Sequence, residues 1–152
     1  MKYWLMKSEP DCYSIDDLKR EKIGMWDGVR NYQVRNMMRD DMKKGDLALF
    51  YHSNAKEIGV AGVMEIVKEA YPDPTQFDPK SEHPDPKSDP ENPRWLCVDV
   101  RYKRTLPRIV TLVEIKQQKS LSDLPLVQKG SRLSVMEVKK SHFDRILKMA
   151  EK

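Results

Sequence analysis

Segments of strand length are spread along this chain, and most of them are separated by helices or long loops instead of tight hairpin turns. The apolar or alternating patterns typical of strands occur in residues 2–7, 47–53, 59–71, 95–102 and 133–138. When strands are not all joined by hairpins, some neighbouring strands run parallel and others antiparallel. The sequence therefore predicts an α+β domain, built as a small mixed β-barrel or strongly curved sheet flanked by short helices.

Four segments carry the start signals of short helices. Ser, Thr and Asn side chains cap a helix because they accept hydrogen bonds from its first free backbone N–H groups. Caps at Ser14, Asn31, Thr111 and Ser141 predict helices over residues 15–21, 33–42, 112–118 and 142–150. Glu114 completes a capping box with Thr111, although the β-branched residues of that stretch also fit a strand.

Two segments between these elements are predicted to be loops. Residues 24–28 have a glycine at each end and Trp26 in the middle. Residues 72–93 hold seven of the ten prolines, among Asp, Lys and Ser, with Phe77 as the one large apolar side chain. This composition predicts a long, mobile polar loop that is placed as a lid within a single domain of residues 1–152.

Several classes of protein do not fit the composition. No apolar run approaches the roughly 20 residues of a membrane span, and residues 1–10 lack the apolar stretch of a signal peptide. Cys12 and Cys97 stand alone, without the spacing of a metal or redox motif. We therefore expect a protein of a reducing compartment, cytoplasmic or, in a eukaryote, nuclear, with no metal and no cofactor.

The positive charge of the chain is concentrated in its last third. The net charge is +4, whereas residues 94–152 alone carry 14 basic and six acidic side chains, a net of +8. Such an excess attracts polyanions without specifying one, and a solvated basic surface explains it equally well. This third of the chain is the part that we expect to face phosphates.

The sequence favours binding over catalysis. A Gly-rich phosphate loop, a nucleophile elbow and Cys/His metal spacing are all missing from it. One alternative is an enzyme acting on nucleotides or RNA, with Glu9, Asp27 and His52 as an acid–base set. Another alternative is a protein-interaction module that uses the proline-rich loop around Phe77.

Polar and aromatic residues meet in three places where predicted strands end or loops begin. These are residues 7–10, residues 26–32 and residues 51–54. An aromatic face with Ser, Asn and Glu beside it is what a protein needs to stack on an extruded base and read its polar edge. Each residue also has a structural explanation, since Trp26 could fill the core and Asn31 is a helix cap.

Four separated motifs resemble the EVE domain family of the PUA-like superfamily. They are YWLMKSEP at residues 3–10, WDGVRNYQVRN at 26–36, GDLALFYHSN at 45–54 and SRLSV at 131–135. The resemblance implies a PUA-like fold, a small mixed β-barrel flanked by helices. It also implies a nucleic-acid-binding module that reads a modified base, particularly a modified cytosine in DNA. YTH domains of the same superfamily hold a methylated adenine in an aromatic cage.

The resemblance implies a pocket and a phosphate-facing floor, but no catalytic residue. In the pocket Trp26 would be one wall, with Trp95 and Tyr51 as candidates for a second. The implied pocket residues are Lys7, Ser8, Glu9, Trp26, Asp27, Val29, Asn31, Tyr51, His52, Ser53, Asn54 and Trp95. The implied floor or phosphate-facing residues are Arg30, Arg132, Leu133 and Ser134. DNA or RNA, single or double strand, the modification and the oligomeric state all stay open.

Overall fold

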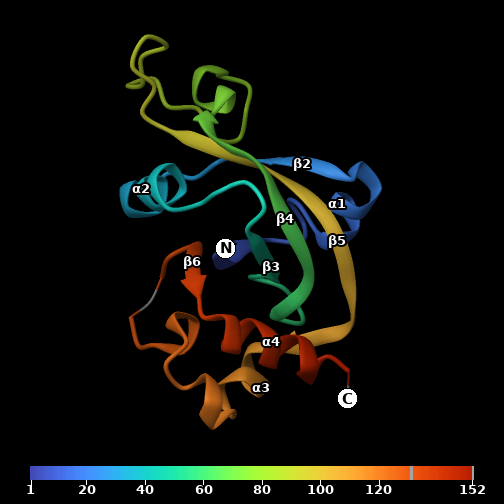
Figure 1. Cartoon of the computed structure of the whole chain (residues 1–152). Helices are drawn as coiled ribbons and strands as arrows, with labels where there is room; N and C mark the ends of the chain where they lie inside the picture. Colours follow the sequence, from blue (N-terminus) through green and yellow to red (C-terminus); the bar gives the residue numbers. More distant parts are fainter. Residues whose placement is uncertain (131, 152) are drawn as a thin grey trace.

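A computed structural model describes residues 1–130 and 132–151, so that Ser131, the first residue of the fourth motif, and Lys152 lie outside the described residues. Six strands form one sheet in the order β2-β5-β4-β3-β1-β6 (Figure 1). The strands are β1 (Tyr3–Ser8), β2 (Ile23–Trp26), β3 (Leu47–His52), β4 (Gly59–Pro72), β5 (Leu96–Thr111) and β6 (Val135–Val138). The α-helices are α1 (Ile15–Glu21), α2 (Tyr32–Asp40), α3 (Leu112–Lys116) and α4 (Lys140–Met149). Short 3-10 helices cover Pro74–Phe77, Lys119–Leu121 and Pro125–Val127.

The sheet is mixed, as predicted, because β1 and β3 run parallel while the other neighbours are antiparallel. In the parallel pair Ser8 lies opposite His52, so β1 and β3 end at the same edge of the sheet. The residues that follow the two strands are therefore brought side by side. This arrangement places the motif around Glu9 next to the motif around Asn54.

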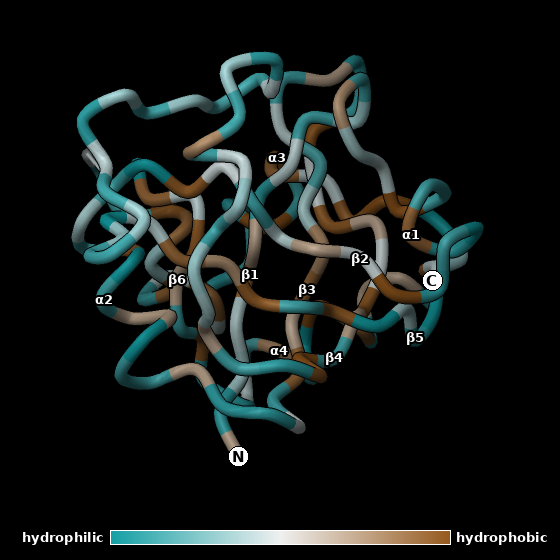
Figure 2. Tube along the Cα trace, turned by 90° about the horizontal axis from the view of Figure 1, so that it is seen from above, coloured by the Kyte–Doolittle hydropathy of each residue, from teal (hydrophilic) through white to brown (hydrophobic). Residues whose placement is uncertain are grey.

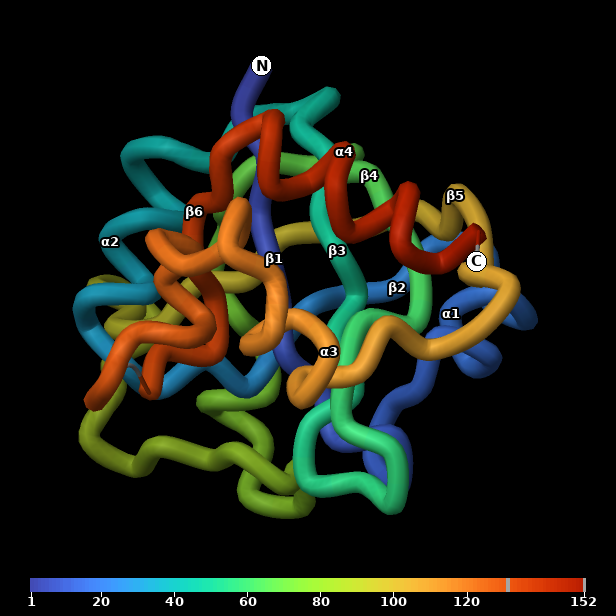
Figure 3. The backbone as a smooth tube through the Cα atoms, turned by 90° about the horizontal axis from the view of Figure 1, so that it is seen from below, coloured from blue at the N-terminus to red at the C-terminus, as the bar shows by residue number. Residues whose placement is uncertain are grey.

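Both faces of β1 are buried, because helices cover the sheet on both sides. Trp4 and Met6 belong to one core cluster, which includes residues of α1 and α2, whereas Leu5 belongs to a second cluster with residues of α3 and α4. Figure 2 shows the hydrophobic residues gathered along the strands and the hydrophilic ones on the outer loops. Figure 3, which views the molecule from below, shows α3 and α4 on the side that faces the reader. This double cover explains the nearly continuous apolar run of β1.

The sheet is strongly curved and open, which is the curved-sheet form of the predicted α+β domain. Its two edges, β2 and β6, are at opposite ends of the strand order and do not pair. The curvature nevertheless brings β2 over β3, since the ring of Trp26 meets that of Phe50 edge-on with centroids 5.3 Å apart. We call the gap between the edge strands β2 and β6 the seam.

Three element predictions were wrong. Residues 24–26, part of the predicted loop 24–28, belong to the edge strand β2 (Ile23–Trp26), with Gly24 and Trp26 on the buried side. β5 continues to Thr111 because Pro107 falls where its pairing with β4 shifts register, a place that tolerates the missing N–H. Ser141 lies inside α4, which begins after Lys139 without a side-chain cap. The capping box of Thr111 and Glu114 is confirmed, as are the caps Ser14 and Asn31.

No helix within residues 1–130 and 132–151 is long and apolar enough to span a membrane. Within the same residues, no group of three His, Cys, Asp or Glu side chains is placed to hold a metal ion.

Candidate functional site

A pocket of about 690 Å³ opens at the seam. Met25 and Trp26 of β2 line one side, while Arg132 and Ser134, just before β6, line another. Between them lie residues from the adjacent ends of β1 and β3. The lining residues are Lys7, Ser8, Glu9, Cys12, Tyr13, Glu21, Met25, Trp26, Asp27, Gly28, Ser53, Thr75, Ser81, Glu82, His83, Arg132 and Ser134. The curvature of the sheet therefore brings three of the four recognised motifs, and the described part of the fourth, to one pocket.

Trp26 is both a core residue and a wall of the pocket. Alternation along β2 turns it to the buried side, where it packs on Phe50, and its side chain is 7% exposed. The two explanations that the sequence offered for Trp26 are compatible, because one part of the ring packs in the core while another lines the pocket. A ring held in this way loses little conformational entropy when a ligand stacks on it.

Two further rings line the pocket together with Trp26, each over a glycine. A Cβ on Gly24 would collide with the hydroxyl of Tyr13, so Tyr13 lies across β2 on the same face as Trp26. A Cβ on Gly28 would lie 2.6 Å from Nε2 of His83, and Gly28 also has a positive φ of 79°. The two glycines of residues 24–28 thus provide the room that these rings occupy.

The polar side chains at the ends of β1 and β3 are largely engaged with one another. Ser8 donates its hydroxyl to the carbonyl of Tyr13 at 2.6 Å. Nδ2 of Asn54 donates to Oε1 of Glu9 at 2.6 Å, and the hydroxyl of Tyr13 donates to Glu21 at 2.8 Å. These bonds fix the rim of the pocket.

Two cations stand at the pocket without an ion pair in the part of the chain that the structure describes. Lys7 is half-buried, with Nζ 5.9 Å from the ring centroid of Tyr51, and its burial lowers the pKa of its ammonium. Arg132 is exposed. An anion at the mouth of the pocket would find both groups available.

Asp27 follows Trp26 directly and is half-buried. Burial raises the pKa of its carboxyl, and the negative charge of Asp73 raises it further, against smaller opposing effects of His83, of Asp27's own backbone N–H and of Arg30. Within residues 1–130 and 132–151 no other side chain donates a hydrogen bond to it. Its environment is therefore unfavourable for a carboxylate that has no ligand.

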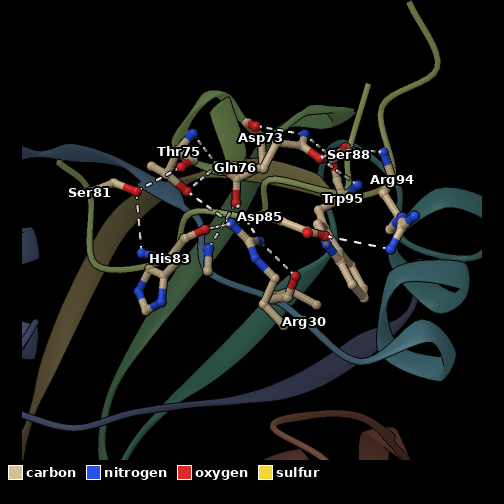
Figure 4. Close-up of polar contacts among 12 residues, drawn as sticks. Arg30, Asp73, Thr75, Gln76, Ser81, His83, Asp85, Ser88, Arg94 and Trp95 are labelled. Carbon is tan, nitrogen blue, oxygen red and sulfur yellow. Dashed lines mark hydrogen bonds and ion pairs between the residues drawn. The ribbon is translucent and has the colours of Figure 1, made fainter. Parts of the chain in front are cut away.

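The proline-rich loop, predicted as a mobile lid, forms a wall of the pocket and is hydrogen-bonded to the body of the protein. Asp73, fully buried, accepts hydrogen bonds from the backbone N–H of Gly28 at 2.9 Å, from Nη1 of Arg30 at 3.1 Å and from Thr75. Arg30 also donates to the carbonyl of His83 (Figure 4). The His83 ring points away from this network in Figure 4, and it lines the pocket. Thr75, Ser81 and Glu82 line the same wall.

The same network holds the far end of the loop. The buried Gln76 binds both the N–H and the carbonyl of Trp95, and Nε1 of Trp95 donates to Asp85 at 2.6 Å. Trp95 also stacks on Tyr32 with centroids 4.8 Å apart. Trp95, a predicted candidate for the second wall, therefore belongs to the anchor of the loop and is not among the residues that line the pocket.

Other predicted pocket residues also lie outside the pocket. Tyr51 is buried in the second core cluster and Val29 in the first. Asn31 caps α2 by accepting from Val34 N–H at 3.0 Å. Nε2 of His52 accepts from the N–H of Ile15 at 3.1 Å, and burial lowers the pKa of His52, which leaves it a neutral structural acceptor.

Three more predicted residues have contacts that differ from their predicted roles. Asn54 does not line the pocket but holds Glu9, which does. Arg30, predicted to face phosphates, uses its guanidinium for Asp73, Thr75 and His83. Leu133, predicted for the floor or the phosphate-facing side, packs against the first core cluster, whereas its neighbours Arg132 and Ser134 line the pocket.

The acid–base set proposed for an enzyme is not assembled. Glu9 and Asp27 line the pocket, but His52 does not, and its ring nitrogen is occupied by Ile15 N–H. The residues that sequence reasoning missed are chiefly Tyr13 and His83. The signal that could have found them is the GMWDG segment, whose two glycines leave space on either side of Trp26.

Fold and pocket together define a binding domain: an open, curved α+β sheet with an aromatic pocket in its seam. A family model of the EVE domain matches residues 2–149. The chain belongs to the EVE domain family, which confirms the resemblance that the four motifs indicated.

Relatives match nearly the whole chain. Human thymocyte nuclear protein 1 is 44% identical over 169 residues, which cover 99% of this chain and 74% of the human protein. A solved structure of human THYN1 protein in complex with 5-methylcytosine-containing DNA has a TM-score of 0.93 and 43% identity, and the match covers 100% of this chain and 99% of that chain. A structure from Pseudomonas syringae has a TM-score of 0.94 and 50% identity, and covers 97% of this chain and 99% of that chain.

Proposed function

We propose that this protein binds DNA and reads a modified cytosine, which is flipped out of the helix and held against Trp26 in the seam pocket. The observation that carries the proposal is the aromatic wall of Trp26 in a pocket of about 690 Å³ that the rings of Tyr13 and His83 also line. The human relative crystallised with 5-methylcytosine-containing DNA supports the same ligand class.

Stacking supplies most of the affinity for the base. A base on an aromatic face gains about 1–3 kcal/mol. A 5-methyl group adds apolar area against Trp26 and Met25, and burying one such group is worth about 0.8 kcal/mol, roughly a fourfold change in affinity. The pocket would therefore prefer a methylated cytosine to an unmodified one by a modest factor.

Lys7 and Arg132 would bind the phosphates on either side of the flipped nucleotide. Both cations lie at the pocket, and neither forms an ion pair with a residue of the described ranges. This function is non-covalent and needs no cofactor. It requires a compartment that holds DNA, which is the cytoplasm of a bacterium or the nucleus of a eukaryote.

The test compares Trp26→Leu and Trp26→Phe on matched duplexes that carry one cytosine or one 5-methylcytosine. We expect the wild type to bind the methylated duplex more tightly. Trp26→Leu should weaken that binding by about 1–3 kcal/mol, and Trp26→Phe, which keeps a ring, by less. The measurement is the Kd by fluorescence anisotropy, with thermal unfolding to show that each variant is folded.

Phe77→Leu is the matched control, since Phe77 is a partly exposed ring outside the pocket. It should leave the Kd unchanged. If Trp26→Leu also binds both duplexes as the wild type does, the pocket does not hold the base and the proposal is wrong.

A further inference from the structure

We propose that Asp27 makes the pocket select cytosine over thymine, by accepting a hydrogen bond from the exocyclic 4-amino group of the flipped base. This inference rests on the proposed function and names the residue that determines its specificity. 5-Methylcytosine and thymine carry the same methyl group, so that stacking and apolar contact cannot tell them apart.

The two bases differ in the polar edge that they present. Cytosine has an amino donor at position 4, where thymine has a carbonyl acceptor. An ionised carboxylate only accepts hydrogen bonds, so it attracts the first group and repels the second. The selecting residue should therefore be an acidic side chain beside the stacking wall, and its carboxylate should not already accept a hydrogen bond from another side chain of the protein.

Four acidic side chains line the pocket, and three of them do not meet these conditions. Glu9 accepts from Asn54, and Glu21 accepts from the hydroxyl of Tyr13. Glu82 is exposed on the proline-rich loop, where water screens it. Asp27 alone is half-buried, adjacent in sequence to Trp26 and without a donor from another side chain among residues 1–130 and 132–151.

The backbone on both sides of Asp27 is held in place. On one side Trp26 pairs with Val98 in the sheet. On the other side the N–H of Gly28 donates to the buried Asp73 at 2.9 Å. The neighbouring carboxylate of Asp73 is itself taken up by Gly28, Arg30 and Thr75, which leaves Asp27 as the one available to a ligand. A preorganised acceptor of this kind costs little entropy on binding.

The unliganded environment of Asp27 favours the arrival of a donor. Burial and the charge of Asp73 both disfavour its carboxylate, as its raised pKa reflects. A half-buried carboxylate without a side-chain donor carries a desolvation cost that its own backbone N–H offsets only in part, and an amino group of the ligand would reduce that cost further.

The test is the ratio of affinities for 5-methylcytosine and thymine in the wild type, in Asp27→Asn and in Asp16→Asn. The target base is placed opposite an abasic site in otherwise identical duplexes, so that neither base loses a pairing partner when it is flipped. We expect the wild type to favour 5-methylcytosine by at least about fivefold. Asp27→Asn should bring the ratio close to one, because an amide can turn to offer either an acceptor or a donor.

Asp16→Asn removes the same charge from an exposed position in the first turn of α1, outside the pocket, and should keep the wild-type ratio. If Asp27→Asn retains that ratio while its melting temperature shows a folded protein, Asp27 does not select the base. That result is distinguishable from failure of the proposed function, in which the wild type itself would not distinguish methylated from unmethylated duplexes and Trp26→Leu would have no effect.

Discussion

Trp26 stands between two glycines, and each glycine leaves room for a ring that lines the same pocket. Gly24 makes room for Tyr13, and Gly28 makes room for His83. Since His83 comes from a loop more than 50 residues away in sequence, Gly28 is the residue that couples this loop to the aromatic wall.

Gly28→Ala should therefore destabilise the protein and weaken DNA binding. The positive φ of 79° alone costs about 1–2 kcal/mol for a residue with a Cβ, and the new methyl would displace the His83 ring. Gly45→Ala is the matched control, because Gly45 has a φ of 95° but no atom within 4 Å of the place that a Cβ would take. Urea unfolding and the Kd for methylated duplex are measured for both. Equal losses of affinity in the two variants would show that the approach of His83 does not matter.

The raised pKa of Asp27 leads to a prediction about how stability depends on pH. Its pKa is raised in the folded protein, so its ionisation opposes folding, and the stability it contributes is lost as the pH rises through that pKa. Asp27→Asn should thus be more stable than the wild type at pH 7. The charged groups facing Asp27 are Asp73, His83 and Arg30, and the mutation leaves them in place.

The gain should shrink as the pH falls toward about 4, where an unfolded aspartate also becomes protonated. Denaturant unfolding of both proteins between pH 7.5 and pH 4.5 measures the difference. An Asn variant that is less stable at pH 7 would mean that the carboxylate has a stabilising partner in the free protein.

Among the elements, the proline-rich loop is anchored to the body of the protein chiefly by the side chain of Asp73. Asp73 accepts from Gly28, Arg30 and Thr75, while Gln76 ties the same segment to Trp95. Burial by itself raises the pKa of Asp73, but the hydrogen bonds from Thr75, Gly28 and Arg30 outweigh it and place the pKa below its ordinary value. The carboxylate therefore contributes stability at neutral pH that is lost only as the pH falls through this lowered pKa.

Asp73→Ala should release the loop from the body of the protein. It leaves four donor groups of Gly28, Arg30 and Thr75 without their acceptor, and we expect a cost of about 2–3 kcal/mol, at the low end for a buried pair because Arg30 is partly exposed. Hydrogen exchange at the amides of Gln76 and Trp95 should accelerate. Asp89→Ala, in an exposed turn of the same loop, is the control and should change little. Unchanged exchange in Asp73→Ala would mean that other contacts hold the loop.

Most elements were predictable because their signals are local. The cap residues Ser14, Asn31 and Thr111 lie beside the N–H groups that they bind, and the apolar run of β1 marks a strand buried on both faces. β2 was missed because a four-residue edge strand has one buried side and too few residues to show alternation. The anchoring of residues 72–93 was missed because its key contacts, Asp73 with Arg30 and Gly28, are tertiary.

At the scale of the whole molecule, an open sheet is what provides the site. The edges β2 and β6 do not pair, and the pocket lies in the seam between them, lined by residues of or next to both strands. The motifs predicted which segments meet, but not which side chains face inward. Tyr51 and His52 are neighbours on β3 and so face opposite sides of the sheet, Tyr51 in the second core cluster and His52 against the N–H of Ile15. Val29, in the loop before α2, packs in the first core cluster.

The charge of the molecule gives a prediction on salt dependence. Affinity for DNA should fall with rising salt, because phosphate contacts release counterions. Arg132→Gln should weaken methylated and unmethylated duplexes alike, and lower the slope of log affinity against log salt by about one. Lys148→Gln, on α4 and outside the pocket, is the control. A selective loss for the methylated duplex in Arg132→Gln would place Arg132 on the base instead of the phosphate.

The position of the modified base itself is the most direct measurement. A duplex with a single 5-methylcytosine whose methyl carbon is ¹³C-labelled is bound to the protein, and intermolecular nuclear Overhauser effects from that methyl group are recorded. We expect them to the indole protons of Trp26, and loss of contacts between the methyl group and its neighbours in the base stack. Contacts only to the neighbouring bases, or to protein residues away from the seam, would contradict the proposal that this pocket holds the modified cytosine.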